Sequence, residues 1–139
     1  MKLALDTGIA ALAKKGEELC GDVVGIKKGD NATVVVLSDG LGSGVKANIL
    51  ATLTSKIAAN LIVKGIPLPE VVHTITETLP ICQTRKIAYS TFTAIRIDGE
   101  NMLQAIQVDN PPILLVRNSE VIPLTGKVNN IAGRNILEV

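Results

Sequence analysis

Aromatic side chains are almost missing from this chain of 139 residues. It has no tryptophan, one tyrosine (Tyr89) and one phenylalanine (Phe92), so it lacks the platforms on which proteins that bind single-stranded nucleic acids stack bases. Neither sign of charge is in excess, because 14 lysines and arginines accompany 13 aspartates and glutamates. Without a basic field there is nothing to hold a polyphosphate backbone. We therefore expect no nucleic acid among the partners.

Histidine and cysteine are equally scarce. His73 is the single histidine, and its helical spacing from the neighbouring apolar residues places it on a solvated face, away from any Ser-His-Asp or Cys-His mechanism. The two cysteines, Cys20 and Cys82, lie far apart without C-x-x-C spacing. This spacing favours packed free thiols in a reducing cytoplasm over a disulfide framework or a zinc site.

A long uninterrupted apolar run is also absent. Lys46, Lys56 and Asn60 interrupt the longest apolar region, residues 45–66, whereas a membrane-spanning helix needs about 20 predominantly apolar residues in succession. We therefore expect no membrane segment. Hydrophobic residues nevertheless make up 47% of the chain, with a mean hydropathy of +0.37, which indicates a large core or an apolar surface for a partner.

Residue periodicity predicts a single α+β domain over residues 1–139. Alternating or continuous β-branched runs predict strands, and a 3.6-residue apolar period predicts helices. The predicted strands span residues 3–13, 23–26, 33–37, 90–97, 102–108, 113–116 and 121–124, and the predicted helices span residues 45–64 and 70–79. Residues 125–139 show little periodicity. Because strands are grouped with strands and helices with helices, we expect mainly antiparallel sheets.

Two aspartates stand out at the ends of the first predicted hairpin. If the turn is centred on Asp30 and Asn31, Asp22 lies directly opposite Asp39, with β-carbons about 5 Å apart. Unneutralised carboxylates at this distance repel each other, and two hard cations about 3.5–4 Å apart can be bridged by such a pair. A register slip of one residue would separate them. From the spacing alone, two ordinary strand-end aspartates remain an alternative.

A glycine-rich loop, residues 40–44, connects the second strand to the first helix. Main-chain N–H groups at a helix start attract anions, which would suit a phosphate. The loop matches neither common nucleotide-binding pattern, because Val45 separates Gly44 from Lys46 and the third glycine of a dinucleotide fingerprint is misplaced. The spacing therefore favours a sharp strand-to-helix turn.

Several segments together resemble the metal-dependent protein serine/threonine phosphatases, and within them the bacterial stage II sporulation protein E type. They are residues 16–22 (Gly-Glu-Glu-Leu-Cys-Gly-Asp) and 35–44 (Val-Val-Leu-Ser-Asp-Gly-Leu-Gly-Ser-Gly). Residues 90–94 are similar to that branch's "aTa" strand, and residues 107–115 to its "aGhpPplL" stretch. The resemblance extends over about residues 5–125.

This resemblance implies an αββα sandwich of two mainly antiparallel sheets flanked by helices. It further implies that Asp22 and Asp39 bind two Mn²⁺ or Mg²⁺ ions as catalytic residues, with the Gly40 carbonyl as another ligand. The ions would activate a water for in-line attack on phosphoserine or phosphothreonine in a protein substrate, without a phosphoenzyme.

The chain departs from the family pattern at its C-terminal end. The family closes with a strand and a second Ser/Thr-Asp-Gly motif, which does not occur before Val139; Asp98-Gly99 instead predicts a hairpin tip. We therefore expect an incomplete domain, with an uncovered sheet edge through which it forms a homodimer. Two other functions stay open: a non-catalytic interaction module of the same fold, and a nucleotide-binding domain that uses residues 40–44.

Overall fold

The computed structural model describes residues 5–12, 15–16, 21–40, 44–78, 91–108, 111–124, 126–131 and 134–138. In chain order the elements are β1 (Asp22–Lys28), β2 (Ala32–Asp39), α1 (Gly44–Val63), α2 (Leu68–Thr78), β3 (Thr91–Asp98), β4 (Leu103–Val108), β5 (Leu115–Arg117), β6 (Glu120–Ile122), β7 (Lys127–Ile131) and β8 (Arg134–Glu138). No helix in these ranges is sufficiently long and apolar to span a bilayer.

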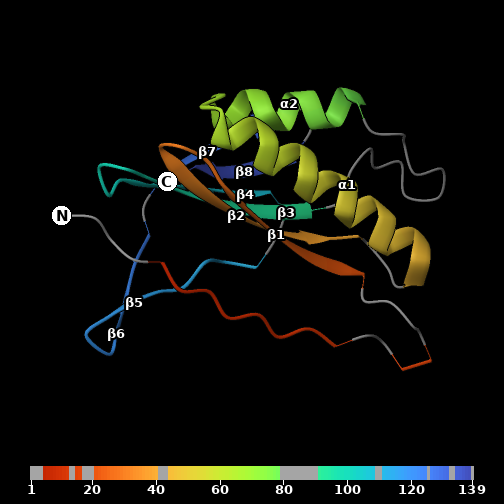
Figure 1. Cartoon of the computed structure of the whole chain (residues 1–139), viewed down its shortest axis with the longest axis horizontal. Coiled ribbons are helices and arrows are strands. Elements are labelled where there is room, and N and C mark those ends of the chain that lie inside the picture. Colours follow the sequence, from red (N-terminus) through yellow and green to blue (C-terminus); the bar gives the residue numbers. More distant parts are fainter. Residues whose placement is uncertain are drawn as a thin grey trace.

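A six-stranded antiparallel sheet, in the order β1-β2-β3-β4-β8-β7, forms the centre of the fold. Helices α1 and α2 lie together over one face, while the β5-β6 hairpin and the N-terminal segment lie on the other side (Figure 1). The α+β class with antiparallel sheets is thereby confirmed. Of the two sheets of the sandwich, the described residues form one large sheet and one two-stranded hairpin.

The hydrophobic core lies between the large sheet and the two helices. Alternate residues of β2, β3 and β4 point toward the helices, as the period of two along a strand requires. The core residues are Val34, Val36, Ala58, Ala59, Ile62, Leu68, Val71, Val72, Ile75, Phe92, Ala94, Ile106 and Val108. The odd-numbered residues of β2 therefore point to the opposite face, which bears the candidate site described below.

Local sequence accounts for the helix boundaries. Helix α1 ends at Val63 and is followed by a glycine in the left-handed region, Gly65 (φ 88°). The N–H of Gly65 donates to the Ile62 carbonyl at 3.0 Å, and that of Ile66 donates to the Leu61 carbonyl at 3.2 Å. These two bonds make a Schellman cap. Helix α2 carries Pro69 in its first turn, where a missing N–H costs nothing. Both helices agree with the sequence-based prediction to within two residues at each described end.

The prediction of a strand over residues 3–13 is wrong for the part that the structure describes. Residues 5–12 form no strand and are exposed. Four of them, Thr7 to Ala10, line a cavity of about 330 Å³ together with Val24, Ile26, Val35 and Leu37. The segment therefore crosses the open face of the sheet and does not run along an edge, where a strand would find main-chain partners.

Residues 125–139, whose weak periodicity predicted no strand, contribute two strands to the large sheet. They contain the hairpin of β7 and β8, and β8 pairs with β4, where Ile106 lies opposite Glu138 and Val108 lies opposite Ile136. The edge of β4 is therefore covered by β8 over these residues. Pairing with β4 supplies main-chain hydrogen bonds to β8, which the weak local sequence pattern did not predict.

Candidate metal centre

The first hairpin has the predicted register. Its turn is closed by the Gly29 N–H, which donates to the Ala32 carbonyl at 2.8 Å, and Asp22 and Asp39 are direct partners across β1 and β2. Directly opposite residues of antiparallel strands project from the same face. Asp39 is half-buried and Asp22 is exposed, so the two carboxylates meet at the end of the sheet, on the face away from the helices.

The surroundings of Asp22, Asp39 among them, affect its protonation. Partial desolvation raises the pKa of Asp22, and the negative charge of Asp39 and a side-chain hydrogen bond with Asp39 raise this pKa further. A hydrogen bond between two carboxyl groups needs a shared proton. Without a cation Asp22 thus retains its proton to higher pH than an isolated aspartate, and a bound cation would favour its ionised form.

Gly40 connects this pair to helix α1. Its N–H donates to the Gly21 carbonyl at 2.9 Å, which extends the hairpin one step beyond the aspartates. A β-carbon at Gly40 would lie 1.9 Å from the carbonyl oxygen of Ala47 in the first turns of α1. Only glycine permits this approach of main chain to main chain. The main chain of Gly40 is therefore held next to Asp39 by contacts on both sides.

The donor set suits a hard divalent cation. Carboxylate and main-chain carbonyl oxygens are the ligands that Mg²⁺ and Mn²⁺ prefer, and Mg²⁺ normally keeps several waters. Among the described residues no group of three or more histidine, cysteine or acidic side chains is placed to hold a metal ion. Two carboxylates and a carbonyl thus fit a cation that retains much of its hydration.

Other residues singled out from the sequence lie outside this centre. His73 is exposed on α2, where its Nε2 lies 3.1 Å from Glu77 Oε1, which confirms the solvated placement. Cys20, Cys82 and the loop residues 41–43 fall outside the described residues, so neither the thiols nor the full glycine-rich loop can be placed.

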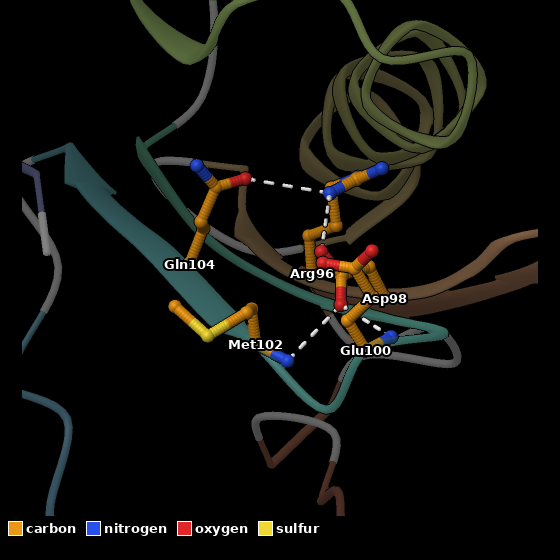
Figure 2. A network of polar contacts seen from close by, with 5 residues as sticks. All are labelled: Arg96, Asp98, Glu100, Met102 and Gln104. Atoms are coloured by element: carbon orange, nitrogen blue, oxygen red, sulfur yellow. Dashed lines mark hydrogen bonds and ion pairs between the residues drawn. The ribbon is translucent and has the colours of Figure 1, made fainter. Parts of the chain in front are cut away.

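The opposite end of the sheet has a polar network that sequence reasoning did not identify (Figure 2). Asp98 Oδ1 accepts hydrogen bonds from the main-chain N–H groups of Glu100 at 2.9 Å and Met102 at 3.0 Å. Asp98 Oδ2 lies 3.8 Å from Arg96 Nη1, which donates to Gln104 Oε1 at 3.4 Å. The Asp-Gly-Glu turn signal correctly predicted the hairpin tip, but not the partners of the carboxylate.

A family model of stage II sporulation protein E (SpoIIE) matches residues 29–130, most of the chain. The chain belongs to the SpoIIE family. The family resemblance is thus confirmed, over a match that includes Asp39-Gly40 and begins after Gly21-Asp22. No curated protein sequence matches the chain significantly.

Solved structures of PP2C-type domains share this fold. One contains the PP2C phosphatase domain and a regulatory fragment of SpoIIE from Bacillus subtilis (TM-score 0.73, 23% identity, 94% of this chain and 40% of that one). Another is RsbX in complex with magnesium (0.59, 24%, 90% and 58%). A third has the RsbU and RsbW domains of Rv1364c from Mycobacterium tuberculosis (0.67, 19%, 92% and 38%). The SpoIIE chain is thus more than twice as long as the part that this protein matches.

Proposed function

We propose that the protein hydrolyses phosphoserine or phosphothreonine in a protein substrate, in a reaction that depends on Mn²⁺ or Mg²⁺. One observation carries the proposal: in a chain of the SpoIIE family, Asp22 and Asp39 lie directly opposite each other. The magnesium in the RsbX structure and the regulatory proteins among the structural neighbours support the choice of cation and of substrate class.

Each residue has a defined task in this reaction. Asp22 and Asp39 would hold the cations and offset their charge, and the carbonyl of Gly40, which follows Asp39 in the chain, would be a further ligand. The bound cations would lower the pKa of a water and orient it for in-line attack on the phosphorus. His73, the single histidine of the chain, lies exposed on α2 next to Glu77, away from the two aspartates.

Metal binding and hydrolysis test the proposal separately. Calorimetric titration with Mn²⁺ should detect binding to the unmodified chain, and Asp39→Asn should abolish it, because the amide keeps the shape but removes the charge. Asp22→Asn should have nearly the same effect. Asp98→Asn is the matched control, since that carboxylate lies at the other end of the sheet, and should leave Mn²⁺ binding unchanged.

Hydrolysis of p-nitrophenyl phosphate with and without Mn²⁺ then separates an enzyme from a non-catalytic module of the same fold. Mn²⁺-dependent turnover that is lost in Asp39→Asn supports the phosphatase. Mn²⁺ binding without turnover, both in this chain and in a longer chain of the family, would favour the interaction module. The limited set of two described carboxylates is the observation that keeps this second candidate in consideration.

We further propose that residues 1–139 act as one domain, that the protein works in the cytoplasm and that it forms a homodimer. Among the described residues, the outer strands of the large sheet are β1 and β7. A dimer would pair along one of these two edges. An unpaired strand edge readily pairs with a second copy. Sedimentation at micromolar concentration should show a dimer, and a monomer without concentration dependence would contradict this.

A further inference from the structure

The row of residues that contains the two aspartates continues onto a third strand. Asp39 is the direct partner of Asp22 on β1 and also of Thr91 on β3. Since direct partners share a face of the sheet, Asp22, Asp39 and Thr91 project side by side from the same end of the same face. Thr91 is only 7% exposed, whereas Asp22 is open to solvent. The row therefore runs from an exposed carboxylate to an enclosed hydroxyl.

Thr91 is the enclosed residue of this row that lies next to a carboxylate. Two residues farther along β3, Thr93 lies opposite Leu37 on β2 and opposite Gln107 on β4, and the cavity of about 290 Å³ around Thr93 is lined by Val35, Leu37 and Ile95 together with residues 111–113. The neighbour of Thr93 on β2 is thus apolar, whereas the neighbour of Thr91 on β2 is Asp39. A hydroxyl enclosed beside a carboxylate is stabilised only when it makes a hydrogen bond.

We propose that Thr91 is a positioning residue of the candidate metal centre, whose hydroxyl holds an oxygen atom on the Asp39 side of the bound cations. This inference rests on the proposed function. Neighbouring β-carbons in such a row are about 5 Å apart, and a hydroxyl bonds an oxygen at about 2.7 Å, so Thr91 reaches an oxygen held by Asp39 or by a cation on Asp39. That oxygen belongs either to a cation-bound water or to the phosphoryl group of the substrate.

Three variants test this role. Thr91→Val keeps the shape and removes the hydroxyl, Thr91→Ser keeps the hydroxyl, and Thr93→Val removes a hydroxyl of similar burial from the same face and strand. The first measurement is the Mn²⁺ dissociation constant by calorimetry. The second is the dissociation constant of inorganic phosphate for the Mn²⁺-saturated chain. Thermal unfolding in EDTA shows whether each variant is folded.

We expect Thr91→Val to weaken binding about tenfold, the lower end of the losses seen when a partner of a metal ligand is removed. Weaker Mn²⁺ binding assigns the oxygen to a cation-bound water, and weaker phosphate binding alone assigns it to the phosphoryl group. Thr91→Ser should restore either value, and Thr93→Val should change neither.

Two results overturn the inference: unchanged binding of both ions by Thr91→Val, or an equal loss in Thr93→Val. If the unmodified chain binds Mn²⁺ and Asp39→Asn does not, these results leave the proposed function standing. If the unmodified chain binds no Mn²⁺, the proposed function fails, and this inference fails with it.

Discussion

The two ends of the large sheet both carry aspartates, but in opposite electrostatic settings. At one end, the Asp98 carboxylate accepts two main-chain N–H groups and lies near the Arg96 guanidinium. At the other end, Asp22 faces a second carboxyl group, and the proximity of Asp39 contributes to its raised pKa. An aspartate surrounded by donors stabilises its turn, whereas two aspartates that face each other leave negative charge available to a cation.

Gly40 and Gly99, at the two ends of the sheet, also differ in the space around them. The main chain of Gly40 lies against that of Ala47, whereas a β-carbon at Gly99 would have its nearest neighbour, the Asn31 carbonyl oxygen, at an ordinary 3.7 Å. The candidate metal centre therefore tolerates no side chain where β2 turns toward α1. At the other end Gly99 has space for a β-carbon, whereas a β-carbon at Gly29 would lie 2.6 Å from a methyl carbon of the flexible Val63 side chain.

The largest expected effect comes from Gly40→Ala. Because the new β-carbon would overlap the main chain of Ala47 at 1.9 Å, β2 and α1 must separate, at a cost of about 3 kcal/mol or more in the free energy of unfolding. Urea unfolding followed by circular dichroism measures this cost. Gly99→Ala is the matched control and should change the free energy by less than about 1 kcal/mol. Equal effects at both glycines would contradict the close approach seen at Gly40.

A smaller loss is expected for Asp98→Ala. Two main-chain N–H groups lose their acceptor and Arg96 loses its nearby charge, which should lower the free energy of unfolding by about 1–2 kcal/mol. Asp98→Asn keeps one oxygen as an acceptor and should lose less. Neither variant should change the affinity for Mn²⁺; a change would mean that the two ends of the sheet are not independent.

The smallest expected effect is a gain in stability, from Asp22→Asn in the absence of metal. The raised pKa of Asp22 in the folded chain means that its ionised form disfavours the fold at neutral pH, and that this penalty fades as the pH falls through the raised value. Without metal, Asp22→Asn should therefore raise the melting temperature by about 1–2 °C at pH 7, a small gain because solvent screens an exposed carboxylate. The gain should disappear on acidification.

With saturating Mn²⁺ the unmodified chain should melt at a higher temperature than Asp22→Asn. The unmodified chain gains stability from the bound ion, and Asp22→Asn does not. A metal-free Asp22→Asn protein that melts below the unmodified one at pH 7 would show that Asp22 stabilises the fold, as Asp98 does, and would remove the contrast between the two ends.

Much of this protein follows from local sequence. The 3.6-residue period predicts both helices, and the family assignment follows from the Gly-Asp and Asp-Gly segments. The tight turn at Asp30 and Asn31 sets the β1-β2 register, because a short loop leaves only one alignment of its two strands. The opposition of Asp22 and Asp39 could therefore be deduced without a structure.

Contacts between segments that are distant in the sequence could be established only from the tertiary structure. The register that brings Thr91 beside Asp39 joins β2 to β3 across a connection that includes both helices, and no local turn constrains such an alignment. The pairing of β8 with β4 and the course of residues 5–12 across the open face likewise depend on surfaces supplied by other segments. Alternating apolar residues show that a segment has two faces, but only packing against the rest of the chain determines which surface each face meets.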